Sequence, residues 1–168
     1  MAQLDLKTRL ELKVPPLLVV LIAMALMYGI AHSSFTLPMG LSGTVLSWSL
    51  VIAFAGTGLG LMLMGVVSFK RASTTPSPIN PEQASSLVRS GLYRYTRNPM
   101  YLGMLLLLTA WGVYLDSWLC LVVLPAFVAY IGRFQIAPEE RALFKLFGND
   151  YRMYKEEVNR WFGYKNMS

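Results

Sequence analysis

The feature that most constrains this chain is an uncharged stretch from Val14 to Phe69, 56 residues without a single Asp, Glu, Lys or Arg. A helix needs about 20 apolar residues to cross the hydrocarbon core of a bilayer, so the stretch is long enough for two crossings. Charged residues make up only 14% of the 168-residue chain, against roughly 25% in a typical soluble domain. The sequence therefore excludes a soluble globule and a disordered chain, and it predicts an integral membrane protein.

The hydropathy pattern predicts an all-α fold, a polytopic membrane helical bundle of four spans. The four apolar runs lie at 14–35, 45–69, 99–115 and 118–134. Only Asp116 and Ser117 separate the last two runs, which are short, so we expect them to form a tight helical hairpin. We expect a single domain over 1–168, with a cytoplasmic linker at 70–98 and cytoplasmic helices at 135–168. A cleaved signal peptide is the alternative for the first run, which is long for that role and lacks a clear small-x-small cleavage site.

The charge distribution orients this bundle in the membrane. Of the fifteen Lys and Arg residues, three lie in 1–13, five in 70–97 and seven in 133–168, and none lies in the connections at 36–44 and 114–117. Because cytoplasmic loops are enriched in Lys and Arg, we expect both termini in the cytoplasm, at a bacterial or archaeal inner membrane. The net charge of +6 then follows from orientation and does not indicate nucleic-acid binding.

The apolar runs contain no clear catalytic group. With one cysteine, Cys120, and one histidine, His32, the chain can form neither an intrachain disulfide nor a His/Cys metal cluster. The glycine-rich string at 56–60 resembles a nucleotide-binding loop, but no strand precedes it and no cation lies near it in sequence. The spacing of Gly56 and Gly60 is instead typical of glycines at which two membrane helices pack closely.

Two segments outside the apolar runs contain the residues that could do chemistry. The segment 85–103 is dense in Arg and Tyr and continues into the third run, where Asn98 is a favourable N-cap and Pro99 a favourable first helical residue. After the fourth run, a proline is followed by Glu139 and Glu140, and acids in a first helical turn complement the helix dipole. Interfacial arginines and tyrosines, together with helix-start acids, would explain both segments without any function.

The end of the chain is predicted to form two further helices. Gly148 and Asn149 are suited to end the first of them. In the second, four apolar residues recur at helical spacing, namely Tyr151, Tyr154, Val158 and Trp161. We expect such a helix to lie on the membrane surface or against the preceding cytoplasmic loop.

Four motifs in these segments resemble, in the same order, those of the integral-membrane isoprenylcysteine carboxyl methyltransferases and the related phospholipid methyltransferases. The motifs are S-G-L-Y at 90–93, R-N-P-M-Y-L-G at 97–103, E-E-R-A-L at 139–143 and F-G-N-D-Y-R-M-Y at 147–154. The resemblance implies methyl transfer from S-adenosylmethionine to a lipophilic acceptor at the cytoplasmic membrane face. It also implies a cytoplasmic cofactor pocket that the C-terminal segment closes.

The resemblance further implies which residues form the site. For binding S-adenosylmethionine it indicates Ser85, Ser86, Leu87, Val88, Tyr93, Asn98, Pro99, Met100, Tyr101, Glu139 and Glu140. For the reaction, Arg97 or Arg133 could orient an anionic acceptor, and Gln135 stands at the position that would meet the acceptor; no metal is implied. Carboxylates and aromatic faces can stabilise the cationic sulfonium of this cofactor, so the residue types are compatible with that ligand.

Two residues depart from the family pattern. Asn98 stands where the family usually has His, and its amide can donate and accept hydrogen bonds but carries no charge. Gln135 stands where the eukaryotic carboxyl methyltransferases have an Arg that is proposed to meet the substrate carboxylate. We therefore expect an acceptor other than a prenylated cysteine carboxylate, such as an amine or another lipid head group, which enters from the bilayer.

Two other interpretations of the sequence stay open. The chain could be a non-catalytic membrane protein that binds lipid or scaffolds a partner through its aromatic and basic surface. It could also be an NADPH-dependent reductase, because membrane sterol reductases resemble this family in their cofactor half, although this chain is short for their full bundle. No feature of the sequence specifies an oligomeric state.

Overall fold

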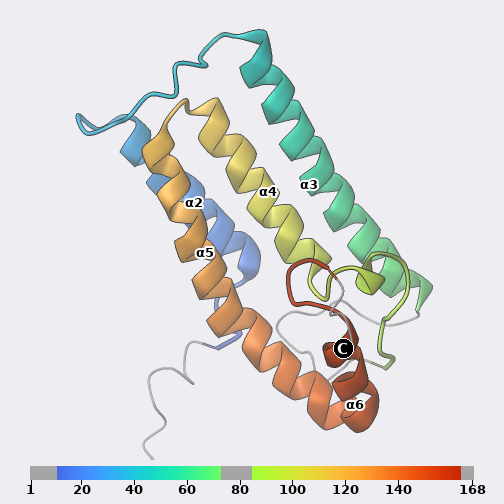
Figure 1. The fold of residues 1–168 in the computed structure, drawn as a ribbon. Coiled ribbons are helices and arrows are strands. Elements are labelled where there is room, and N and C mark those ends of the chain that lie inside the picture. The colour runs from blue at the N-terminus through green and yellow to red at the C-terminus, as the bar shows by residue number, and fades with distance from the viewer. Residues whose placement is uncertain (1–10, 73–84, 164–168) are drawn as a thin grey trace, which may run out of the picture.

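The computed structural model describes residues 11–72 and 85–163, which form a bundle of helices (Figure 1). In chain order the long helices are α2 (Pro16–Ala31), α3 (Val45–Arg71), α4 (Pro99–Tyr114), α5 (Val123–Ile131) and α6 (Ala137–Glu157). Shorter helical turns are η2 (Gly91–Arg94), η3 (Trp118–Val122) and the π-helical turn η4 (Gly132–Ile136). The described residues contain no strand beyond isolated bridges, which confirms the predicted all-α class.

Helix α4 lies between α3 and α5, and α2 packs against both α4 and α5 (Figure 1). Helices α5 and α6, with η3 and η4, form one helical path from Trp118 to Glu157. By length and composition this path and α3 are each able to cross a membrane, whereas α2 and α4 are apolar but shorter. Each of the latter has 16 residues, which corresponds to about 24 Å of helix against roughly 30 Å of hydrocarbon core.

The C-terminal part of this path differs from the prediction in two places. The expected boundary between the fourth span and the cytoplasmic helices falls inside η4, so the helix continues where a break was expected. The predicted break at Gly148 is confirmed, since its φ of +50° and ψ of −118° interrupt α6 in a region that favours glycine. The predicted helix through Trp161 is wrong beyond Glu157, because Val158 takes an extended backbone and packs into a cluster of tyrosines.

Glycines of α3 allow it to pack closely against α4. Close packing at glycines was predicted, but the glycines in contact are Gly58 and Gly65 and not the predicted Gly56 and Gly60. A Cβ atom added to Gly58 would lie 2.7 Å from the carbonyl oxygen of Gly103, and one added to Gly65 would lie 2.8 Å from Cγ of Met100. Gly56 and Gly60 have nothing within 4 Å of the same position. The two packed glycines of α3 are seven residues apart, which is two helical turns and therefore one face.

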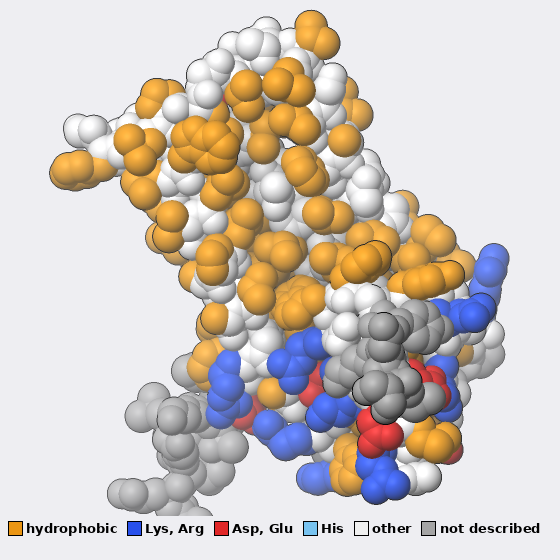
Figure 2. All heavy atoms as spheres, viewed as in Figure 1, with side chains coloured by type: hydrophobic (Ala, Val, Ile, Leu, Met, Phe, Trp, Pro, Cys, Tyr) orange, Lys and Arg blue, Asp and Glu red, His pale blue; other side chains and the backbone are white. Residues whose placement is uncertain are grey.

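The two connections that lack Lys and Arg lie together at one end of the bundle. The backbone N–H of Leu41 donates to the carboxylate of Asp116 at 2.9 Å, and that of Trp118 donates to the carbonyl of Leu37 at 2.9 Å. Figure 2 shows Lys and Arg side chains gathered at the opposite end, where α6 lies, and hydrophobic side chains over the rest of the visible face. The tertiary structure thus segregates charge along the bundle as the sequence predicted.

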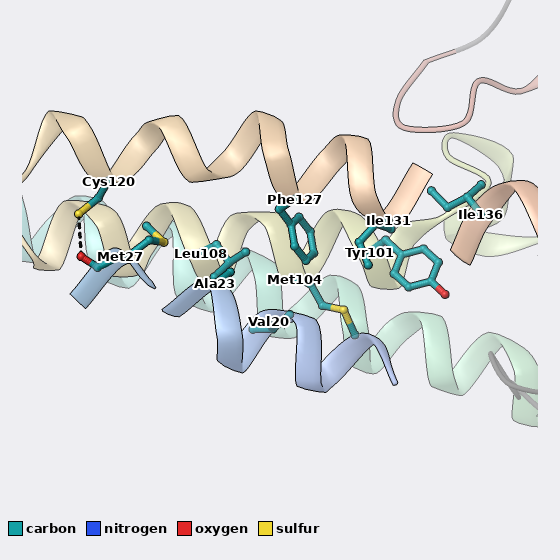
Figure 3. Close-up of a cluster of buried hydrophobic side chains, with 10 residues drawn as sticks. All are labelled: Val20, Ala23, Met27, Tyr101, Met104, Leu108, Cys120, Phe127, Ile131 and Ile136. Carbon is teal, nitrogen blue, oxygen red and sulfur yellow. Dashed lines mark hydrogen bonds between the residues drawn. The ribbon is translucent and has the colours of Figure 1, made fainter. Parts of the chain in front are cut away.

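The main hydrophobic core runs along the inside of the bundle (Figure 3). Its buried members are Val20, Ala23 and Met27 of α2, Tyr101, Met104 and Leu108 of α4, and Cys120, Phe127, Ile131 and Ile136 of the α5 path. The thiol of Cys120 donates to the carbonyl of Met27 at 3.1 Å, which agrees with its expected role as a small buried residue. The core ends at Tyr101 and Ile136, where the polar residues of the candidate site begin.

Candidate functional site

The first turns of α4 and α6 meet through a pair of side chains. Tyr101 follows Pro99, the first residue of α4, and Glu139 follows Pro138 at the start of α6. The buried hydroxyl of Tyr101 donates a hydrogen bond to Oε1 of Glu139. Two of the motifs, which are about forty residues apart in the sequence, are therefore in direct contact.

Within the described residues, Glu139 is a carboxylate with no basic partner. No Lys or Arg of the described ranges forms an ion pair with it, and Tyr101 is its hydrogen-bond donor. Burial raises the pKa of the Glu139 carboxyl to about 8; the Tyr101 hydrogen bond opposes this rise and the charge of Glu140 adds to it. A carboxyl in this state can bind a cation or take up a proton near neutral pH, a property that the sequence pattern did not reveal.

Glu140, the next residue, has the opposite surroundings. Its Oε1 lies 3.0 Å from Nη1 of Arg97 and 3.0 Å from Nε of Arg160, while its Oε2 lies 2.9 Å from Nη2 of Arg160. Lys155 approaches at 3.9 Å. Burial by itself would raise the pKa of Glu140, but hydrogen bonds from Arg160 and the charges of Arg97 and Arg160 hold it below its ordinary value. The carboxylate of Glu140 is thus committed to ion pairs inside the protein.

The segment after α6 closes over the residues that precede α4. The N–H of Arg97 donates to the carbonyl of Asn159 at 3.1 Å, and the N–H of Gly163 donates to the carbonyl of Tyr95 at 2.9 Å. Asn98 occupies the N-cap position, as predicted, but its side chain does not cap the helix. Its amide instead donates to the carbonyl of Arg160 at 2.9 Å, so this residue joins the loop to the C-terminal segment.

A cluster of tyrosines fills the space beneath this closure. Its buried members are Val88, Tyr93, Tyr151, Tyr154 and Val158, and Leu87 packs against it. The hydroxyl of Tyr154 donates to the carbonyl of Tyr93 at 2.7 Å, and Nη1 of Arg97 donates to the hydroxyl of Tyr151 at 3.3 Å. Of the two placements expected for the end of the chain, on the membrane surface or against the preceding loop, the structure shows the contact with the loop. The tyrosine spacing was visible in the sequence, whereas nothing there marked Arg160 as a partner of Glu140.

The remaining predicted cofactor residues lie at the edges of this region. Ser85 is exposed, and the hydroxyl of Ser86 donates to the carbonyl of Ala72 at 2.9 Å. Pro99 is buried and, with Met100, faces Gly65 of α3. These last two residues pack the end of α4 against α3 and so fix where Tyr101 stands.

Arg133 and Gln135 contact the N-terminal segment, whereas Arg97 contacts Glu140 and Tyr151. Nη1 of Arg133 lies 2.6 Å from a carboxylate oxygen of Glu11, and Nε2 of Gln135 donates to the carbonyl of Val14 at 2.7 Å. Gln135 is 1% exposed, and its Oε1 has no hydrogen-bond partner among the residues that the structure describes. Because only Nε2 can donate to a carbonyl, the amide orientation is fixed and Oε1 is an available acceptor.

A model of the phospholipid methyltransferase family matches residues 48–150 of this chain, which covers α3, α4, α5 and most of α6. The chain belongs to this family. Membership indicates a membrane methyltransferase and supports the predicted resemblance. The match includes the Tyr101–Glu139 contact and Glu140, whereas α2 and Arg160 lie outside it.

Two known proteins are similar in sequence to parts of this methyltransferase family member. An uncharacterized protein of Haemophilus influenzae is 45% identical over 62 residues, which are 37% of this chain and 98% of that protein. Methanethiol S-methyltransferase 1 of Bradyrhizobium diazoefficiens is 37% identical over 68 residues, which are 40% of this chain but only 23% of that protein. No solved structure matches the chain.

Proposed function

We propose that this protein transfers a methyl group from S-adenosylmethionine to a lipophilic acceptor at the cytoplasmic face of the membrane. The observation that carries the proposal is Glu139, a half-buried carboxylate that pairs with Tyr101 and with no Lys or Arg of the described residues. A sulfonium is a cation, and a carboxylate beside aromatic rings is a favourable place for one. Family membership supports the same reaction class.

The residues around Glu139 fit the proposed cofactor. Glu139 and Tyr101 would stabilise its positive charge, and Leu87, Val88 and Tyr93 supply apolar surface on the adjoining cluster. When bound, S-adenosylmethionine supplies an activated methyl group, so the protein has mainly to align the acceptor and exclude water. Glu140, Arg97 and Arg160 keep the C-terminal segment closed over this region.

The acceptor proposed here is lipophilic and reaches the site from the bilayer. Large hydrophobic side chains of α2 and α3 are exposed on the bundle surface, including Leu21, Ile52 and Leu63, as expected where lipid surrounds the protein. Gln135 presents a neutral amide oxygen, which suits an amine, thiol or hydroxyl head group better than a carboxylate. The Bradyrhizobium relative is named for methanethiol, so thiols belong among the acceptors to be tested.

We also propose four spans with both termini in the cytoplasm of a bacterial or archaeal cell. The gathering of Lys and Arg at the α6 end of the bundle supports this orientation (Figure 2). Two helices long enough to span and two shorter apolar ones support the number. In this orientation the Tyr101–Glu139 pair lies at the cytoplasmic interface.

The test of the function is calorimetry and thermal unfolding of the purified protein with S-adenosylmethionine, S-adenosylhomocysteine and NADPH. We expect both adenosyl ligands to bind and raise the melting temperature. Stabilisation by NADPH alone would indicate a reductase, and stabilisation by none of the three would indicate a non-catalytic lipid-binding protein.

Two variants locate the proposed cofactor contact. Glu139→Gln and Tyr101→Phe each remove part of the pair, and the expected loss of S-adenosylmethionine binding is about 1–3 kcal/mol. If the carboxylate meets the sulfonium, Glu139→Gln weakens S-adenosylmethionine more than S-adenosylhomocysteine, which lacks that charge. Glu156→Gln, on the exposed surface of α6, is the matched control. Unchanged binding in both site variants would place the cofactor elsewhere.

A further inference from the structure

The N-terminal segment just before α2 crosses the junction between α5 and α6. Glu11 forms ion pairs with Arg133, which lies in η4, and with Arg141, which lies in α6. Between these pairs, the backbone N–H of Leu12 donates to the carbonyl of Phe134 at 3.1 Å. The bond from Gln135 to the carbonyl of Val14 completes the set. Four contacts thus join a short stretch of chain to a junction more than 120 residues away in the sequence.

The hydrogen bond from Leu12 satisfies a backbone carbonyl that the sequence of the junction leaves without a helical donor. In an α-helix the carbonyl of Phe134 would accept a hydrogen bond from the N–H of residue 138, but Pro138 has none. The junction adopts the π-helical turn η4, a form that is rare and is frequently found at functional sites. The N-terminal segment therefore supplies a donor where the helix cannot supply its own.

The backbone of the segment is strained in making these contacts. Leu12 has a φ of +58°, a left-handed conformation that is unfavourable for a residue with a branched apolar side chain. Such a conformation persists only where the surrounding contacts fix it. The ion pairs of Glu11 on one side and the bond to Val14 on the other are the contacts that do so here.

The junction sets the place of Glu139. This residue lies in the first turn of α6, which follows η4 directly, so any rotation of the helix at η4 would move its carboxylate relative to Tyr101. We propose that Glu11 is a positioning residue, which holds the α5–α6 junction in its π-helical register through Arg133 and Arg141 and so places Glu139 against Tyr101. This inference rests on the proposed function for its meaning in catalysis, whereas the positioning itself can be measured without any cofactor.

The direct readout is the titration of the Glu139 carboxyl, followed by infrared spectroscopy and assigned by its loss in Glu139→Gln. The titratable groups that face Glu139 are Tyr101 of α4, Tyr93 of η2 and Glu140 of its own helix. None of them changes in Glu11→Gln, which keeps the side-chain shape but removes both ion pairs. We expect the Glu139 midpoint, near 8 in the wild type, to fall toward the ordinary value for a carboxyl as water reaches it.

The second readout is calorimetry with S-adenosylhomocysteine. We expect Glu11→Gln to bind about tenfold more weakly, the size of effect typical of coupling through a contact network, and Glu11→Asp to stay close to wild type. Glu156→Gln removes the same charge from an exposed position on α6 and should match the wild type in both readouts. If Glu11→Gln does not fold, Arg141→Gln is the substitute, because it leaves the ion pair between Arg133 and Glu11 in place. It should shift both readouts in the direction expected for Glu11→Gln, but by a smaller amount.

The two readouts separate the two ideas. A wild-type midpoint and affinity in a folded Glu11→Gln protein would overturn the positioning role and leave the proposed function intact. A wild-type protein that binds no S-adenosylhomocysteine would overturn the proposed function, while the infrared titration would still decide whether Glu11 positions Glu139.

Discussion

Replacing Glu140 by Gln should remove the centre of the ion-pair network that closes the site. The Glu140 side chain is 11% exposed, and its partner Arg97 is 7% exposed at 3.0 Å. Arg160 and Lys155 also approach it, but both reach solvent. The substitution keeps the shape of the side chain and leaves the buried guanidinium of Arg97 without its carboxylate.

The magnitude follows from the burial of each pair. Removing one partner of a buried ion pair destabilises a protein by about 3–5 kcal/mol, and this term applies to Arg97. The pairs with Arg160 and Lys155 are partly solvated, so each adds roughly 0–1 kcal/mol. We therefore expect Glu140→Gln to lower the free energy of unfolding by about 3–5 kcal/mol, most of it from Arg97.

The matched control is Glu157→Gln on the same helix. Glu157 pairs with Arg89 at 3.4 Å, and the two side chains are 42% and 38% exposed. Breaking an exposed pair of this kind changes stability by roughly 0–1 kcal/mol. The two substitutions are chemically identical, so the difference between them isolates the effect of burial.

The assay is denaturant unfolding in detergent micelles followed by circular dichroism, with amide hydrogen exchange of residues 158–163. We expect Glu140→Gln to unfold earlier and to lose exchange protection in the C-terminal segment. Because the pKa of Glu140 is below its ordinary value, its contribution is present above that ordinary value and is lost as pH falls through the lowered pKa. The wild type and the variant should therefore converge at low pH. Equal stability of Glu140→Gln and Glu157→Gln at neutral pH would refute the reasoning.

Three further predictions test the packing, the titration and the orientation. Gly58→Ala places a Cβ atom 2.7 Å from a backbone oxygen of α4 and should destabilise the protein by about 1–3 kcal/mol. Gly56→Ala meets open space and should stabilise the protein by roughly 0.4–1 kcal/mol. Unfolding in micelles measures both effects. The pKa of Glu139 is raised to about 8 from 4.5, so the folded protein holds this proton more tightly than the unfolded chain. The free energy of unfolding should therefore fall as pH rises from 4.5 to about 8. This pH dependence should vanish in Glu139→Gln, and its survival there would point to another group. Cysteines introduced at Ser42 and Lys145, both exposed, should react with impermeant reagents from opposite sides of the membrane, and labelling of both from one side would contradict the proposed topology.

The sequence by itself determined what depends on local composition. The uncharged stretch specified apolar helices, because a backbone in lipid must satisfy its own hydrogen bonds. Pro99 was predicted to begin α4 and Gly148 to interrupt α6, and both do so, since the φ angles that these residues favour are intrinsic to them. The ordered motifs were sufficient to indicate the family, and the asymmetry of Lys and Arg predicted the segregation of charge that the bundle displays.

Only the tertiary structure decided which residue of each similar pair has which role. Gly56 and Gly58 are alike in sequence, but only Gly58 faces α4, because the face a helix buries depends on the position of its neighbour. Glu139 and Glu140 are adjacent acids, yet one meets a tyrosine and the other two arginines. Only the structure shows that Arg133 contacts Glu11, 122 residues away. The energy of a charge is set by the groups and the solvent that surround it in space, and those come from segments that no local pattern connects.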